Sequence, residues 1–166
     1  MTALLRIASA LDGLVAGILS FGRVLAFPVV VLLFLQWPLR DWVHAYSREA
    51  NDLGQWLFAL YVAMAVTAAT RAGTHLATDV IARGYSLRTR TILLRAAALI
   101  GVLPWALFVL IAGRGLVVSS LLAREAFPDT ANPGYFVVKL ALWLLAGLML
   151  AQALVDLIRP RREDAT

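Results

Sequence analysis

Three polar side chains with the spacing of one helix face follow a long apolar run: Arg71, His75 and Asp79. If a helix continued through them, the i, i+4, i+8 spacing would align them on one side, with His75 between a cation and a carboxylate. The charge of such a histidine would respond to both neighbours. One His and one Asp are too few ligands for a metal site. The spacing is equally compatible with a polar network and with an ordinary polar turn that ends a membrane span.

The rest of the sequence offers little catalytic chemistry. It has no cysteine, which excludes disulfides, thiolate metal sites and cysteine nucleophiles. The two histidines, His44 and His75, fall in connections expected on opposite sides of a membrane, so haem ligation by paired histidines is not expected. No metalloprotease, nucleophile-elbow or phosphate-loop pattern occurs. We therefore expect no enzyme activity, no cofactor and no metal.

The composition is that of an integral membrane protein. Of the 166 residues, 61% are hydrophobic and 15% are charged, and the mean hydropathy is +0.82. Several apolar runs reach the roughly 17–25 residues that a helix needs to cross a bilayer. The formal charge of +5 comes from arginines at the ends of these runs, which indicates membrane topology and lipid headgroups rather than nucleic acid.

The expected fold is an all-α integral membrane protein: four transmembrane helices and an N-terminal amphipathic interfacial helix in a single membrane domain, 1–166. The N-terminal segment has an apolar face and a polar face at helical spacing, which is typical of a helix at the membrane surface. A secretory signal is the alternative, but Asp12 interrupts its apolar core and no small-residue cleavage site follows. The expected bounds are 2–20 for the interfacial helix and 21–39, 53–70, 87–124 and 135–158 for the spans, the third longer than a bilayer requires.

Proline, serine and small residues predict local features of these helices. A kink is expected at Pro28, and Ser86 is expected to cap the third span. Small residues that permit close helix packing recur four apart on the second and fourth spans. These residues are Ala59, Ala63 and Thr67, and the pair Gly147 and Ala151.

The distribution of basic residues predicts the orientation. With the N-terminus inside, ten arginines lie on the inner side and five basic residues on the outer side, which places both termini in the cytoplasm. The inner set is Arg6, Arg23, Arg71, Arg83, Arg88, Arg90, Arg95, Arg159, Arg161 and Arg162, and the outer set is Arg40, Arg48, Arg114, Arg124 and Lys139. Arg83, Arg88 and Arg90 are candidate partner or lipid contacts. Arg114, in the outer half of the third span, either extends to the headgroups or faces a protein partner.

No carboxylate is expected near the midpoint of a span, where ion coupling or catalysis inside a membrane normally needs an ionisable group. Asp12 falls in the expected surface helix, and Asp156 falls near the inner end of the last span. The chain is therefore not expected to transport a solute alone.

The run RAGTHLATD resembles the R-x-G-x-H-[IL]-x-x-D signature of the small membrane subunit of TRAP transporters, the tripartite ATP-independent periplasmic systems (DctQ-like family). Arg71, Gly73, His75 and Asp79 occupy the signature positions. In that family the signature follows the second of four spans, as it does here.

A second stretch, LQWPLR, resembles the Gln-x-x-x-Arg ending of the family's first span, with Gln36 and Arg40 at the two positions. Many relatives have paired acidic residues at the start of the second span, where this chain has Asn51-Asp52, so the acidic role maps onto Asp52. Pro38 also departs from the common pattern. The resemblance in layout covers nearly the whole chain, but only these stretches are specific.

The resemblance implies a non-catalytic small permease subunit in a bacterial inner membrane. Its partners would be a large TRAP membrane subunit, which holds the substrate and sodium sites and moves as an elevator, and a periplasmic substrate-binding protein. The substrate would be an organic acid or related anion, and the outer loops, 40–52 and 125–134, would be the natural contacts for the binding protein. Two alternatives remain: a stand-alone four-helix transporter or channel, and a membrane anchor of a redox or signalling complex.

Overall fold

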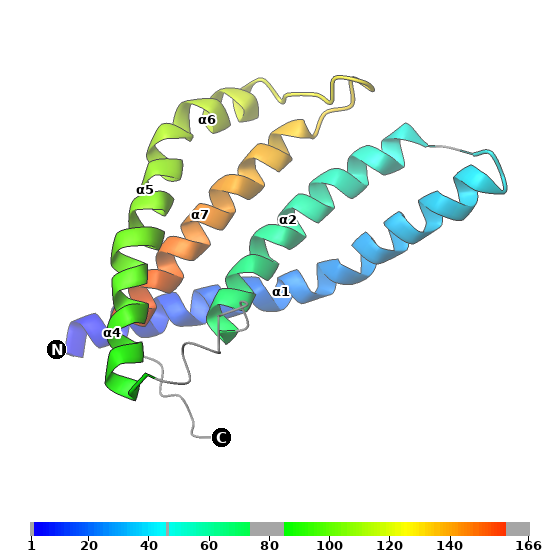
Figure 1. Cartoon of the computed structure of the whole chain (residues 1–166). Helices are drawn as coiled ribbons and strands as arrows, with labels where there is room; N and C mark the ends of the chain where they lie inside the picture. Colours follow the sequence, from blue (N-terminus) through cyan, green and yellow to red (C-terminus); the bar gives the residue numbers. More distant parts are fainter. Residues whose placement is uncertain (1, 46, 74–84, 159–166) are drawn as a thin grey trace.

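The structure is a computed structural model that describes residues 2–45, 47–73 and 85–158, and in these residues the chain is almost entirely helical (Figure 1). The elements are α1 (Thr2–Asp41), α2 (Arg48–Ala72), α4 (Leu87–Ala97), the π-helical turn η1 (Ala98–Val102), α5 (Leu103–Ala112), α6 (Arg114–Leu122) and α7 (Tyr135–Ile158). Four stretches are long and apolar enough to cross a membrane: Ala3–Asp41, Arg48–Ala72, Arg88–Ala112 and Tyr135–Ile158. The described residues contain no β-strand. The expected all-α membrane fold with four spans is confirmed.

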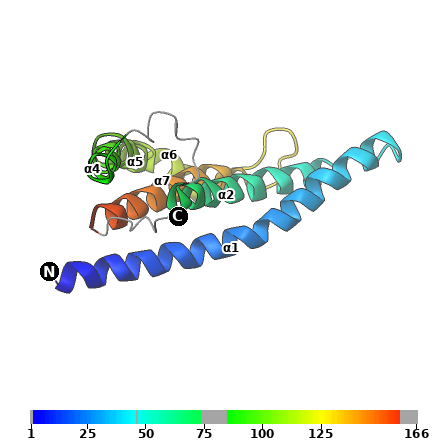
Figure 2. The same cartoon turned by 60° about the horizontal axis from the view of Figure 1, so that its bottom comes forward.

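Helix α7 lies at the centre of the fold. It packs against α2, α1, α5 and α6, and α2 packs on its other side against α1. Figure 2 shows α1 below α7 and α2, and α4 and α5 above α7. The apolar stretch of α7 is accordingly the most buried of the four, at 33%, and that of Arg88–Ala112 the least, at 6%. Most of the α4–α5 surface is therefore left for lipid or for another protein.

The N-terminal part of the chain is one long helix. We expected a surface helix, 2–20, and a separate span, 21–39, but α1 continues through that boundary for 40 residues. Figure 2 shows that it is bent rather than straight, and Pro28 and Pro38 lie inside it, where the missing N–H weakens the helix ladder. At about 1.5 Å per residue, α1 is roughly 60 Å long, about twice the hydrocarbon thickness of a bilayer. The location of 2–20 at the membrane surface stays a prediction.

Side-chain and glycine caps set three helix ends. The Ser47 hydroxyl accepts a hydrogen bond from the Ala50 amide at 3.1 Å, so α2 begins five residues before the expected Leu53. Gly73 ends α2 in the left-handed conformation, with φ 66°. Ser86 accepts from the Thr89 amide at 3.2 Å, which confirms the expected cap.

The third span is interrupted twice. We expected one helix over 87–124, but η1 separates α4 from α5, and Gly113 separates α5 from α6. Pro104 has no N–H to donate to the preceding turn, and the π-helical turn lies directly before it. At the second break, the Leu110 carbonyl accepts a hydrogen bond from the Trp143 indole of α7 at 3.0 Å. This bond joins α5 to α7.

The core between α1, α2 and α7 consists of Val15, Leu19, Met64 and Leu148. Beside it, α1 and α2 approach closely at Gly22. A Cβ atom added to Gly22 would lie 2.7 Å from the Met64 Cβ, so only glycine permits this helix separation.

The two stripes of small residues differ in how closely they pack against other helices of the chain. Ala63 and Thr67 are buried, as expected of a packing face on α2. On α7 the fully buried small residue is Ala146, whereas a Cβ added to Gly147 would meet nothing within 4 Å. The expectation that Gly147 forms a close contact is therefore wrong for packing within this chain.

Candidate functional site

Arg71 joins three helices at one end of the bundle. Its Nη1 lies 2.7 Å from the Asp12 Oδ1 on α1, and the same nitrogen donates to the Gln152 Oε1 on α7 at 3.3 Å. The Gln152 Nε2 in turn donates to the Asp156 Oδ1 at 3.0 Å. We call these four residues the Arg71 network.

The Arg71 network is partly shielded from its surroundings. The side chains of Arg71 and Asp12 are 31% and 36% exposed, and Gln152 is buried. A guanidinium presents several donors in a fixed plane, so one cation can serve a carboxylate and an amide on different helices. Removal of the guanidinium would leave the Asp12 carboxylate without its cation and the Gln152 side-chain oxygen without its donor.

The described part of the signature has a structural explanation. Arg71 lies on the last turn of α2, and Gly73 supplies the left-handed residue that ends the helix. The continuous helix that would align Arg71, His75 and Asp79 is therefore absent, because α2 ends at Ala72. His75 and Asp79 lie outside the described residues, and their expected roles stay predictions.

Asp52 organises the opposite end. It lies near the start of α2, is only 6% exposed, and accepts hydrogen bonds from Thr130 Oγ1 at 2.5 Å and Asn132 Nδ2 at 3.2 Å. Both donors belong to the loop between α6 and α7. A carboxylate from the second span therefore fixes the conformation of a loop almost eighty residues further along the chain.

A second carboxylate, Glu125, holds the same loop to α6 and α7. It accepts from Ser120 and forms an ion pair with Lys139. The Lys139 hydrogen bond, assisted by the Ser120 hydroxyl, holds the pKa of Glu125 below its ordinary value. Lys139 also lies 5.4 Å from the centre of the Tyr135 ring. With Asp52 and its two partners, these residues form what we call the Asp52 cluster: Asp52, Ser120, Glu125, Thr130, Asn132 and Lys139.

Packing and a glycine complete this loop. Phe127 is buried and meets the Tyr135 ring edge-on, with 5.5 Å between ring centres. Gly134 has φ 146°, and a Cβ added there would lie 3.3 Å from the Phe127 ring. A side chain at Gly134 would therefore be strained in its backbone and crowded by Phe127.

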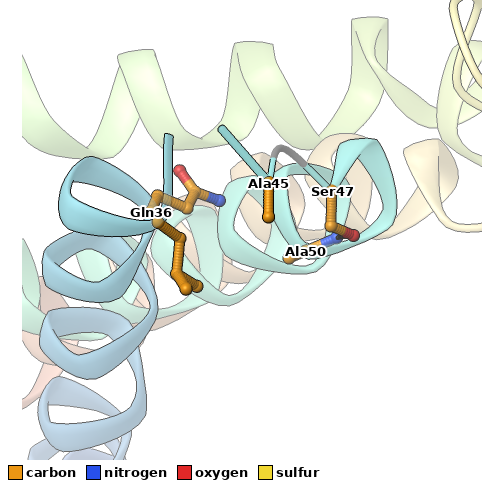
Figure 3. Close-up of a pocket in the computed structure, with 5 residues that line it drawn as sticks. Gln36, Ala45, Ser47 and Ala50 are labelled. Carbon is orange, nitrogen blue, oxygen red and sulfur yellow. Dashed lines mark hydrogen bonds between the residues drawn. The ribbon is translucent and has the colours of Figure 1, made fainter. Parts of the chain in front are cut away.

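Gln36 and Arg40 lie at the same end of the bundle as Asp52, but the Gln36 amide nitrogen is buried and Arg40 is exposed. A Cβ added to Gly54 in the second turn of α2 would lie 3.9 Å from the Gln36 Nε2. That nitrogen is buried without a hydrogen-bond partner among the described residues. Figure 3 shows its side chain beside Ala45, Ser47 and Ala50, which with Gln36 and Leu39 line a pocket of about 220 Å³. Arg40 is exposed and pairs with Asp41 at 2.7 Å.

The basic residues named as candidate contacts lie on exposed surfaces where the structure describes them. Arg88 and Arg90 are exposed on α4, and Arg114 is exposed on the first turn of α6. Arg83 lies outside the described residues. Their contact with lipid or with a partner stays a prediction.

Sequence reasoning missed the partners of Arg71 and of Asp52. Asp12 was expected on the polar face of a surface helix, yet it pairs with Arg71. Gln152 gave a signal that could have been used, since it is a polar residue in an apolar span and lies four residues before Asp156. Thr130 and Asn132 gave no comparable signal, because turn loops rich in such residues are common.

The arrangement suits assembly rather than catalysis. In the described residues no group of three or more His, Cys, Asp or Glu side chains could hold a metal. The carboxylates there belong to the two ends of the bundle, in the Arg71 network or on the side of Asp52. Polar groups placed in this way fix helices and a loop relative to one another.

Comparison with known proteins gives one family match. The family model described as "Tripartite ATP-independent periplasmic transporters, DctQ component" matches residues 29–163. This range contains the last three apolar stretches, the C-terminal third of α1, Asp52 and Arg71. No curated protein and no solved structure matches the chain.

Proposed function

We propose, from the premise that this chain belongs to the DctQ component family of tripartite ATP-independent periplasmic transporters, that it braces a larger membrane subunit during solute uptake. As a member of that family the chain is a small permease subunit and not an enzyme. The transport step itself, sodium-driven uptake of an organic acid or related anion, takes place in the larger subunit. This chain supplies a rigid membrane scaffold against which that subunit moves.

One observation carries this proposal: among the described residues, the carboxylates that bond across structural elements, Asp12 at one end and Asp52 and Glu125 at the other, hold helices and a loop in place. A carrier that couples solute to an ion needs an ionisable group exposed inside a passage. Here the Arg71 network fastens α1, α2 and α7 together. A polar network that fixes three helices favours a static role.

The exposed apolar surfaces support a large membrane partner. The Arg88–Ala112 stretch is 6% buried, and large side chains such as Ile100, Phe108 and Ile111 are more than two thirds exposed. Either lipid or protein can cover such an apolar surface. The exposed side chains are therefore consistent with a large membrane partner, but the proposal depends on the polar contacts described above.

We further infer the orientation and the second partner. The Arg71 end faces the cytoplasm, because basic residues concentrate there. The Asp52 end then faces the periplasm of a bacterial inner membrane. Its ordered loop, 123–134, is a defined surface on which a periplasmic binding protein can dock.

Co-purification tests the proposal. The tagged chain is expressed with and without the large membrane subunit of a transporter of this family, and the complex is isolated in mild detergent. We expect the two chains to form a stable complex, and we expect the Arg71→Ala variant to reduce its yield. Arg48→Gln is the matched control, since Arg48 is an exposed arginine outside the Arg71 network.

Two results would contradict the proposal. One is recovery of the chain without any larger subunit although both are produced. The other is movement of solute by the purified chain alone in liposomes, which would favour the stand-alone transporter. A haem absorbance band in the purified protein would favour the membrane anchor of a redox complex.

A further inference from the structure

Two unpaired polar side chains lie in the groove between α1 and α2. Arg23 on α1 and Tyr61 on α2 line a pocket of about 270 Å³ together with six other residues: Leu19, Gly22, Ala26, Met64, Ala65 and Ala68. Among the residues that the structure describes, none forms an ion pair or a hydrogen bond with the Arg23 guanidinium or the Tyr61 hydroxyl. The groove thus combines one cation and one phenol with walls that are otherwise apolar.

The nearest acidic residue on the same helix, Asp12, does not neutralise the charge of Arg23. Arg23 lies eleven residues beyond Asp12 on α1, which is about 16 Å along the helix, and Asp12 is already paired with Arg71. On α2 the wall residues run from Ala68 to Tyr61, which is about 5–15 Å from Arg71 along the helix axis. The groove therefore begins about one helical turn from Arg71 along α2 and continues toward the Asp52 end.

The groove exists because Gly22 brings the helices together. The backbone of α1 approaches Met64 so closely at Gly22 that a Cβ there would lie 2.7 Å from the Met64 Cβ. Arg23, the next residue, is directed away from that contact and is exposed. Its guanidinium is consequently presented at the edge of the groove rather than buried in the core.

We propose that this groove binds one membrane phospholipid, with the phosphodiester on Arg23 and Tyr61 and an acyl chain along Leu19, Ala26 and Ala65. A guanidinium binds two phosphate oxygens at once, and a phenol can donate to a third. The alanine, leucine and methionine walls match the methylene groups of the chain. A phospholipid supplies both chemistries in one molecule and is present wherever this protein is inserted.

The inference does not rest on the proposed function, because the chain alone would bind the lipid. The test is a titration of the purified full chain, stripped of lipid in detergent, with phosphatidylglycerol, followed by native mass spectrometry. We expect one tightly held lipid per chain. Affinity should fall about tenfold in Arg23→Gln, since a charge-assisted contact is lost. The fall in Tyr61→Phe should be smaller, and Arg48→Gln, at the other end of α2, should bind as the wild type does.

Two further arms define the ligand. Diacylglycerol, which lacks the phosphate, should not displace the lipid, and inorganic phosphate should not displace it either, because it has no acyl chain. Arg23→Lys keeps the charge but loses the bidentate contact, so it should weaken binding less than Arg23→Gln does. If Arg23→Gln does not fold, Tyr61→Phe serves as the test. Unchanged affinity in Arg23→Gln and Tyr61→Phe, an equal loss in Arg48→Gln, or displacement of the lipid by inorganic phosphate would each overturn the proposal.

Discussion

The two ends of this bundle use polar residues for different purposes. At the Arg71 end, the bonded side chains come from α1, α2 and α7. Two of the bonds join α2 to another helix, and the third, from Gln152 to Asp156, lies within α7. At the Asp52 end, the donors to Asp52 come from the loop, and Glu125 of the loop bonds to α6 and α7. One end therefore fixes the relative positions of helices, and the other fixes a loop on helices that are already placed.

This difference assigns separate tasks to the two motifs that sequence reasoning had grouped together. The Arg71 network determines how α1, the longest helix, meets the rest of the bundle. The Asp52 cluster determines the shape of the surface at the opposite end. A change at the first should alter the whole assembly, whereas a change at the second should be felt mainly in the loop.

The largest effect is expected from Arg71→Ala. It leaves Asp12 without its cation and Gln152 without a donor, so the free energy of unfolding should fall by about 2 kcal/mol, reduced from the value for a fully buried pair because Arg71 is partly exposed. Unfolding in mixed micelles measures this. The exchanged pair Asp12→Arg with Arg71→Asp should recover part of the loss. No recovery would show that the loss does not come from the ion pair.

A smaller and more local effect is expected from Asp52→Ala. Thr130 and Asn132 would lose their acceptor, at a cost of about 1 kcal/mol. Hydrogen exchange should rise in 123–134 and stay unchanged in α1. Asp129→Ala is the matched control, since Asp129 is an exposed acidic residue of the same loop. Faster exchange throughout α1 would contradict the division between the two ends.

Acid should loosen the same loop. Because the pKa of Glu125 is lowered in the folded state, its contribution to stability is present above its ordinary value of 4.5 and is lost as the pH falls through the folded pKa, below 4.5. The exchange of 123–134, measured relative to the intrinsic amide exchange rate at each pH, should therefore rise below pH 4.5 in the wild type. In Glu125→Gln the loop should exchange faster at neutral pH and lose this part of the pH dependence. An identical pH profile in both proteins would refute the role of Glu125.

The smallest expected quantity is the coupling between the ends. Arg71 and Asp52 lie nineteen residues apart on α2, which is about 28 Å, and they share no partner. The effects of Arg71→Ala and Asp52→Ala on the free energy of unfolding should add to within about 0.5 kcal/mol. A larger interaction term in the double mutant would mean that the two ends form one unit.

Periodicity and composition predicted the fold class because the membrane requirement is simple: an apolar helix of sufficient length satisfies its own backbone hydrogen bonds. The same reasoning predicted the Ser86 cap and the burial of Ala63 and Thr67. It did not predict that α1 runs unbroken from Thr2 to Asp41. An amphipathic segment and a uniformly apolar segment can belong to the same helix. The change in residue pattern near residue 20 therefore did not mark the end of a helix.

The site was predicted in part. The resemblance singled out Arg71, Gly73 and Asp52, and each has a bonding or capping partner in the structure. The partners themselves, Asp12 and Thr130, lie 59 and 78 positions away along the chain. Such pairs depend on how helices pack, and periodicity within one segment contains no information about them.

The central claim is that this chain is a brace that works only with a larger subunit. The most direct test is solute uptake into proteoliposomes that contain the large subunit and its binding protein, with the chain included, omitted, or replaced by Arg71→Ala. The account predicts uptake only when the chain is present, and weakened uptake with the variant. Full uptake without the chain, or uptake by the chain alone, would contradict it.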